Sequence, residues 1–312
     1  MTSVLARHGF LIIIAGFFAF FSIYNPVFMT FGNQLNIVEG SSILLILALG
    51  MTLVVAMGGI DLSVGIAFDI GAAFAVVALK EYGFAWPMAC LVGVVGGVLV
   101  GLLNAFLVVG LKVSPFMATL GTFFIGSSIQ RVFTNGGGPI SYRQMPQGYR
   151  DLAVGDVFGI PTEIVIAAVV LIVYFIFLER SIWGKRIHAI GLQRSAANVA
   201  GIRVQRYMVV AFLVASATCA IGGLIGSANI RMFTPLAGFS YLLDAIAAVF
   251  IGASMHAKGR PNVIGTLVGV LFLGMIANGL NLMGLNFNLK DALSGLILVG
   301  ALAFAVGQRR LR

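Results

Sequence analysis

The chain has 312 residues, of which 60% are hydrophobic and only 9% are charged. Soluble globular domains carry about 25% charged residues, so this composition excludes an ordinary soluble enzyme or binding domain. The formal net charge is +9 at pH 7, but the basic residues concentrate at the ends of apolar stretches and form no basic face with interleaved aromatic residues, which argues against nucleic-acid binding.

Long charge-free runs separated by turn residues predict a helical membrane protein. A helix that crosses the hydrocarbon core needs about 20 apolar residues. We therefore expect an all-α polytopic bundle of about ten transmembrane helices in a single domain over residues 1–312. An uncleaved first helix is expected, because no small-x-small cleavage site precedes Asn25-Pro26. The predicted spans cover about 9–24, 41–57, 62–80, 86–110, 115–134, 161–178, 208–230, 242–256, 262–283 and 291–307.

The segment between the sixth and seventh predicted spans is the most basic part of the chain. Residues Glu179–Arg206 contain six of the nineteen Lys and Arg residues, and Glu179 is the single acidic residue among them. Such an excess of positive charge keeps a loop in the cytoplasm. Counting crossings from this loop places the N- and C-termini in the cytoplasm as well.

Two stretches of the sequence, which begin in the fourth and ninth predicted spans, resemble each other. Asn104 is followed six and seven positions later by Gly110-Leu111, and Asn278 by Gly284-Leu285. By the predicted topology these stretches run in opposite directions, so they suggest a 5+5 inverted repeat of the kind common in transporters. Chance similarity between two Gly-rich apolar helices explains the same observation.

The clearest local motif is Gly58-Gly59-Ile60-Asp61-Leu62-Ser63-Val64-Gly65. Gly58-Gly59 interrupts a helix, and Asp61 either caps the next helix or contacts a substrate along a hydrated path. Asp69 follows seven residues later on nearly the same helix face. A carboxylate inside the membrane faces the bundle interior or water, so Asp69 is a further candidate for the substrate path.

Three amides in predicted spans complete the candidate substrate path: Asn104, Asn278 and Asn281. Amides suit a neutral, hydroxyl-rich cargo such as a sugar. Amides also join neighbouring membrane helices, and the sequence leaves both roles open.

The absence of certain sequence motifs argues against nucleotide binding, metal binding and enzyme activity. The chain has no GxxxxGK[ST] motif, so it does not bind nucleotide phosphate through a P-loop. Cys90 and Cys219 lack metal-site spacing. We therefore predict no enzyme activity, no metal and no cofactor in this chain.

At Gly58–Gly65 the sequence resembles the permease subunits of bacterial ATP-binding-cassette (ABC) importers of the ribose type. Four further stretches share this resemblance: Ser114–Gly121, Gly184–Gly201, Leu243–Val249 and Ile264–Leu280. Together they extend over most of the chain from about residue 35 to residue 305.

The resemblance implies a sugar permease in the bacterial inner membrane that works with other subunits. Its expected partners are a second permease copy or a paralogue, a cytoplasmic ABC ATPase that binds the ATP, and a periplasmic sugar-binding protein. Residues 179–207 match the family's cytoplasmic coupling loop, which presents a short helix to the ATPase. The residues that carry this match are Arg186, Gly191, Ala196, Ala197 and Gly201.

Within that loop, Ser195–Ala200 predicts a short helix that ends at Gly201, where glycine is favoured. The sequence departs from the family at Leu192-Gln193-Arg194, which makes this edge more basic. A secondary transporter driven by an ion gradient, with Asp61 and Asp69 binding the ion, remains an alternative. A channel or a membrane scaffold is a third.

Overall fold

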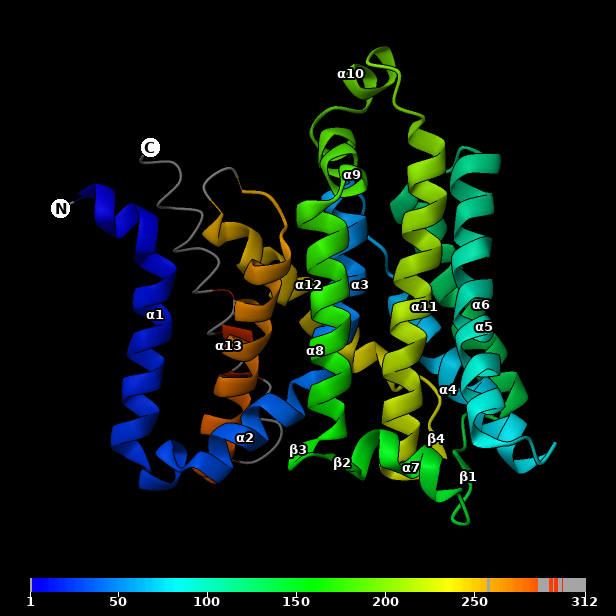
Figure 1. Ribbon diagram of the computed structural model, residues 1–312, viewed down its shortest axis with the longest axis horizontal. Coiled ribbons are helices and arrows are strands. Elements are labelled where there is room, and N and C mark those ends of the chain that lie inside the picture. The colour runs from blue at the N-terminus through cyan, green and yellow to red at the C-terminus, as the bar shows by residue number, and fades with distance from the viewer. Residues whose placement is uncertain (1, 257–258, 286–291, 294, 297–298, 300–312) are drawn as a thin grey trace.

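The computed structural model describes residues 2–256, 259–285, 292–293, 295–296 and 299, and these residues form a bundle of helices (Figure 1). Three short helical turns accompany the main helices: the 3₁₀ turn η1 (Pro26–Met29) and the π-helical turns η2 (Phe106–Gly110) and η3 (Phe175–Arg180). The α-helices are α1 (Thr2–Tyr24), α2 (Phe31–Gly40), α3 (Ser42–Ala56), α4 (Val64–Lys80), α5 (Trp86–Ala105), α6 (Pro115–Phe133), α7 (Gln147–Val154), α8 (Thr162–Tyr174), α9 (Ile182–Leu192), α10 (Arg194–Val199), α11 (Val204–Ile230), α12 (Gly238–Met255) and α13 (Val263–Leu282).

Within the described ranges, two small antiparallel sheets complete the fold. Strand β1 (Ile140–Ser141) pairs with β4 (Met232–Phe233), and β2 (Asp156–Val157) pairs with β3 (Ile160–Pro161). Both sheets lie with α7 at one end of the bundle, and α9 and α10 lie at the other end (Figure 1). The predicted all-α polytopic class is therefore confirmed.

Five described helices are long and apolar enough to cross a membrane, or six if α2 and α3, which meet at a bend of 42°, form one broken span. The five are Trp86–Gly110, Thr162–Arg180, Val204–Ile230, Gly238–Met255 and Val263–Leu282. The number ten and the inverted repeat stay predictions, and most of the predicted span 291–307 falls outside the described residues.

Some helices begin before the predicted spans do. Helix α12 begins at Gly238, four residues before the predicted start, and α11 begins at Val204. In both helices, residues that precede the apolar run continue the helical backbone. Hydrophobicity marks the part of a helix that lies in lipid, whereas the helix itself extends as far as its backbone hydrogen bonds do.

The core forms around α3, which is apolar on all sides and almost completely buried. Helices α11 and α12 pack beside it, and α4, α5 and α11 pack closely against one another because small residues occupy their contacts. A Cβ atom at Gly223 of α11 would lie 2.0 Å from the carbonyl oxygen of Phe68 on α4. Such close backbone approach is typical of helix packing in membranes.

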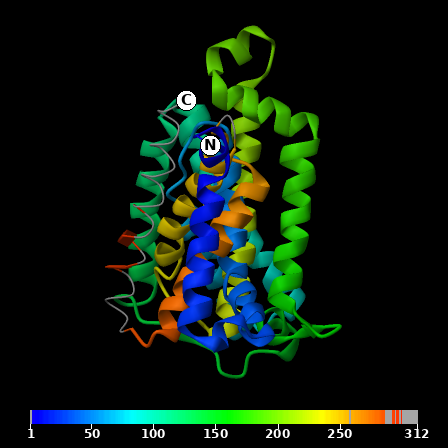
Figure 2. The same cartoon turned by 90° about the vertical axis from the view of Figure 1, so that its left-hand side faces the viewer.

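The two ends of the bundle carry different elements. The start of α1 and the α9–α10 segment lie toward the same end in both views, and α10 projects beyond the membrane-spanning helices (Figures 1 and 2). The α4–α5 connection lies toward the opposite end, on the side of α7 and the strands (Figure 1).

Candidate substrate path and coupling segment

A buried chain of hydrogen bonds connects the turn before α4 to α5 and α6. Asp61 Oδ1 accepts hydrogen bonds from the Ser63 backbone N–H at 2.8 Å and from Ser63 Oγ at 2.6 Å. Asn104 Nδ2 donates to Ser63 Oγ at 2.6 Å, and Thr122 Oγ1 donates to Asn104 Oδ1 at 2.7 Å. All four side chains are buried. The structure therefore brings two predicted path residues, Asp61 and Asn104, into one network.

Asp61 holds the turn that precedes α4 and does not cap the helix itself. The helix begins at Val64, so the backbone N–H that Asp61 binds belongs to Ser63, the residue just before the helix. The second carboxylate oxygen, Asp61 Oδ2, is buried and has no hydrogen-bond partner among the described residues. Because buried polar groups are normally paired, this oxygen is free to accept a hydrogen bond from water or from a hydroxyl of a passing solute.

Asp69 belongs to a second buried group, which holds the segment that leads into α12. Asp69 Oδ1 accepts a hydrogen bond from the backbone N–H of Gly238 at 2.8 Å. From α6, Gln130 Oε1 accepts one from the backbone N–H of Leu236, also at 2.8 Å. Leu236 has a positive φ of 62°, which is strained for a leucine, and these two acceptors help to hold it there. Asp69 thus fixes α4 to the start of α12.

The remaining two predicted path residues lie elsewhere. Asn278 on α13 forms a reciprocal amide pair with Asn33 on α2, with N···O distances of 3.0 and 2.9 Å. This pair joins two helices, which is one of the two roles that the sequence leaves open. Asn281 is exposed one turn further along α13. The structure does not bring either residue into the Asp61–Asn104 network.

The coupling segment, residues 179–207, contains two helices, α9 and α10, and α10 ends in a tight turn. Helix α10 spans Arg194–Val199, and Gly201 follows with a φ of 78°. The Gly201 N–H donates to the Asn198 carbonyl and the Ile202 N–H to the Ala197 carbonyl, both at 3.0 Å. This pair of bonds is a Schellman motif, so the predicted glycine-ended helix is present at this position.

Helix α10 presents a small apolar surface at its tip. Val199 is 90% exposed and Leu192, at the end of α9, is 62% exposed. Ala196 is exposed, whereas Ala197 is buried against the rest of the segment. Exposed aliphatic side chains on a projecting helix are typical of a surface that binds another protein.

Three contacts fix the coupling segment to the bundle. Gly191 of α9 lies against the end of α3, where an added Cβ would be 2.1 Å from the Ala56 carbonyl oxygen and 3.2 Å from the Gly58 nitrogen. Glu179 Oε1 accepts a hydrogen bond from the Val263 N–H, the first residue of α13, at 3.1 Å. Arg186 Nη1 donates to the Tyr207 hydroxyl at 2.7 Å and so connects α9 to α11.

His188 lies half-buried on α9 between these contacts. Burial lowers the pKa of His188 below its ordinary value of 6.5; nearby Glu179 opposes this shift, while Arg260 and His256 add to it. The neutral imidazole is therefore the form that the folded coupling segment favours.

Residues 33–302 match the protein family described as "Branched-chain amino acid transport system / permease component". The chain therefore belongs to this permease family. Among curated relatives, it is 34% identical to the ribose import permease protein RbsC of Bacillus subtilis over 278 residues, which cover 89% of this chain and 86% of that protein. No solved structure matches the chain.

Two further permease relatives from Escherichia coli widen the comparison. The galactofuranose transporter permease protein YtfT is 33% identical, with coverage of 81% of this chain and 74% of YtfT. The autoinducer 2 import system permease protein LsrD is 30% identical, with coverage of 81% and 78%. The permease is thus a transporter subunit of the importer class that includes these proteins, and not an enzyme, which confirms the family resemblance found in the sequence.

Several residues that form hydrogen bonds at these sites were not predicted from the sequence. Ser63 lies in the same motif as Asp61, so its hydrogen bond to Asp61 follows from the turn. Thr122 directly follows the stretch Ser114–Gly121, whereas Gln130 and Asn33 have no neighbouring motif. The packing of α6 and α2 brings all three side chains to their partners. Among the described residues, no group of three or more His, Cys, Asp or Glu side chains is arranged to hold a metal ion.

Proposed function

We propose that this permease imports a monosaccharide or a related small polyhydroxy compound across the bacterial inner membrane, driven by ATP hydrolysis in a partner subunit. The names of its relatives support this cargo class, since they name ribose, galactofuranose and autoinducer 2 as the compounds transported. The neutral hydroxyl and amide groups of the Asp61–Asn104 network suit such a cargo, because they can exchange hydrogen bonds with sugar hydroxyls.

The observation that carries the proposal is the contact between Gly191 and the turn at Gly58. Helix α10 projects from the bundle as the docking site for a cytoplasmic ABC ATPase. Helix α10 follows α9 directly, and Gly191, the last residue but one of α9, contacts the backbone of Ala56 and Gly58. Asp61 follows Gly58 by three residues. Movement of the ATPase would therefore reach the buried network along one short, continuous segment.

The proposed assembly contains two permease chains, alike or related, together with the ATPase and a periplasmic sugar-binding protein. Each permease forms one domain over residues 1–312, with residues 179–207 on the cytoplasmic side. The start of α1 lies toward the same end as α10 (Figure 1), which supports a cytoplasmic N-terminus. We propose about ten spans in a 5+5 inverted repeat and a cytoplasmic C-terminus.

Asp61 and Asn104 are the residues that we propose to line the substrate path. The unpaired Oδ2 of Asp61 supports this role, since it is an acceptor without a partner in the described structure. Asp69 is proposed to act beside them by holding the start of α12. Asn278 is better explained by its pairing with Asn33, and the exposed Asn281 stays a candidate only for a peripheral contact.

A single exposed position tests the ATPase docking surface. Ala196→Arg places a long charged side chain on α10, and we expect loss of ATPase co-purification and of uptake while membrane insertion survives. Gln205→Arg is the matched control, because Gln205 is also exposed on the coupling segment but lies outside α10. Normal co-purification with Ala196→Arg would refute the docking assignment.

Two further measurements separate the alternatives. A cysteine introduced at Ser195 should react with membrane-impermeant reagents only from the cytoplasmic side. Uptake by the purified permease alone, driven by an ion gradient without nucleotide, would instead indicate a secondary transporter. Calorimetry on the associated binding protein identifies the sugar.

A further inference from the structure

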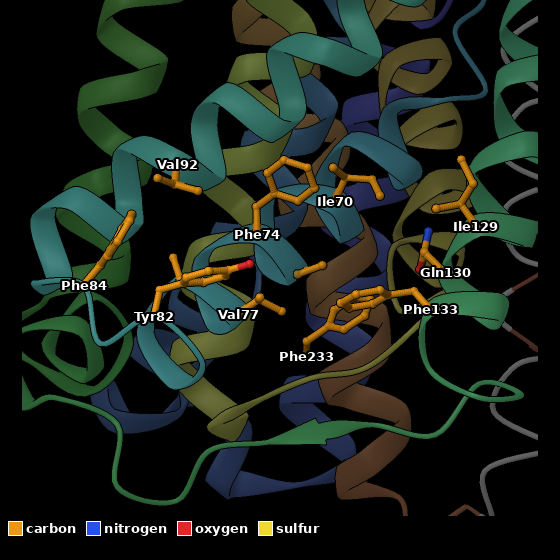
Figure 3. A pocket seen from close by; sticks show the side chains of 12 residues that line it. Ile70, Phe74, Val77, Tyr82, Phe84, Val92, Ile129, Gln130, Phe133 and Phe233 are labelled. Carbon is orange, nitrogen blue, oxygen red and sulfur yellow. The ribbon is translucent and has the colours of Figure 1, made fainter.

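An elongated apolar pocket lies between α4, α5, α6 and β4, at the end of the bundle opposite α10. Its volume is about 390 Å³. Tyr82 and Phe84 lie on one side of the pocket, Ile129, Gln130 and Phe133 lie on the other, and Phe74 lies between them (Figure 3).

The shape of the pocket follows the axis of α4. Its α4 wall is a stripe of apolar side chains three and four residues apart, from Ile70 through Phe74 and Val77 to Ala78. Ile70 and Ala78 are separated by eight helical steps, which correspond to about 12 Å along the axis. The pocket therefore extends along α4 over this length.

The lining chemistry excludes a sugar as the occupant. Apart from the hydroxyl of Tyr82, Gln130 provides the polar side chain of the lining, and its Oε1 is already bonded to the Leu236 N–H. A monosaccharide would leave most of its hydroxyls unpaired against apolar walls, which is strongly unfavourable. An acyl chain has no polar groups that need hydrogen-bond partners, so it fits an apolar lining.

Aromatic residues near the mouth of the pocket are of the kind that concentrates at a membrane–water interface. Tyr82 is 71% exposed and Trp86 is 39% exposed, and Tyr and Trp concentrate at the headgroup level of bilayers. Two exposed basic residues flank the same region, Lys80 next to the α4 wall and Arg131 next to Gln130. Lys80 is paired with Glu81 at 3.6 Å, but exposed pairs of this kind contribute little and exchange readily.

The Gln130 amide faces the protein interior and not the pocket mouth. Its side chain is 2% exposed, and its Nε2 lies near the Asp69 carboxylate on α4. The polar end of a bound lipid is therefore left to the exposed residues at the mouth of the pocket.

We propose that this pocket binds one acyl chain of a phospholipid of the leaflet opposite α10, with Lys80 and Arg131 attracting the phosphate. The inference goes beyond the proposed transport function and does not depend on it, because the pocket is formed by α4, α5, α6, β4 and the α4–α5 connection, without the coupling segment. The bound lipid would fill the space between the helices that carry Asp69 and Gln130.

Native mass spectrometry of the purified full-length permease tests the proposal. After delipidation and addition of dioleoylphosphatidylglycerol, we expect the wild-type chain to retain one phospholipid. Ala73→Phe fills the pocket from α4, whereas Ala168→Phe adds the same side chain at an exposed position on α8. Displacing even two methylene groups would lower lipid affinity about tenfold, so retention should fall in the first variant and not in the control.

A second variant leaves the pocket interior unchanged. Lys80→Gln with Arg131→Gln should abolish any preference for phosphatidylglycerol over phosphatidylethanolamine while a lipid is still retained. Equal lipid retention by Ala73→Phe and Ala168→Phe would overturn the proposal. So would efficient disulfide formation between two copies of Ile129→Cys in native membranes, because a second permease would then cover the pocket. Neither readout requires transport, so a failure here is distinct from a failure of the proposed function.

Discussion

The contact between Gly191 and the end of α3 gives the most direct test of the coupling route. In Gly191→Ala the new Cβ would lie 2.1 Å from the carbonyl oxygen of Ala56. An ordinary contact for a Cβ begins at about 3.4 Å, so α9 and the α3 end must separate by about 1.3 Å, the difference between these two distances. Both neighbours are backbone atoms, and no side-chain rotamer can relieve the overlap.

The size of the effect follows from this overlap. Inserting a methyl group into a well-packed contact costs about 1–3 kcal/mol. If this cost applies to the packed state that transmits movement, the equilibrium between coupled and separated arrangements shifts by about 5- to 150-fold. Gly191→Ala should therefore lower ATP-dependent uptake by at least about fivefold. The tip of α10 is unchanged, so ATPase co-purification should persist.

The assay compares uptake, ATPase activity and co-purification in membranes that contain the permease with its ATPase and binding protein. Gly16→Ala on α1 is the matched control, because a Cβ there has no heavy atom within 4 Å. We expect normal uptake with Gly16→Ala and reduced uptake with retained ATPase binding with Gly191→Ala. Equal uptake by the two variants, or loss of ATPase binding along with uptake, would refute the role assigned to this contact.

Three further predictions concern the buried polar groups and the coupling segment. Asn104→Leu leaves two buried hydroxyls without their amide partner and should lower stability by about 1–3 kcal/mol, whereas Asn281→Leu at an exposed site should have little effect; thermal unfolding in detergent compares them. A double-mutant cycle between Asn33 and Asn278 should give a coupling energy of about 0.6 kcal/mol, and a value of zero would show that the amide pair does not stabilise the α2–α13 contact. The neutral form of His188 contributes stability that is fully present above its ordinary pKa of 6.5 and is lost as the pH falls through its lower pKa in the folded protein. His188→Gln should therefore reduce the loss of thermal stability on acidification, and an unchanged pH profile would contradict this interpretation.

The features that the sequence predicts well are those with a local physical cause. Charge-free runs indicate membrane helices because lipid tolerates few charges, and the glycine-ended helix α10 follows from the left-handed backbone at Gly201. The turn at Gly58 has the same origin, with a φ of 79° that favours glycine. These properties depend on neighbours in the chain and can be read without the fold.

The features that the sequence does not predict depend on which helices meet. Asn104 and Asn278 look alike in the sequence, since each is an amide in a Gly-rich apolar helix. The structure gives Asn104 a place in the Asp61 network and gives Asn278 a partner on α2. The difference arises from the packing of α5 against α4 and of α13 against α2, which is decided by contacts between distant segments.

The same distinction explains why glycines occupy both sides of the coupling contact. Side chains at such a contact would have alternative rotamers, and a small movement of α9 could be absorbed by changing them. Backbone atoms in direct contact have no such freedom, so a displacement of α9 must move the Gly58 turn or break the contact. Asp61 lies three residues further along this turn, and its hydrogen bonds to Ser63 continue the connection to Asn104. A glycine pair thus gives the stiffest available link between the docking helix and the buried network, which is why a single methyl group at Gly191 should be enough to weaken it.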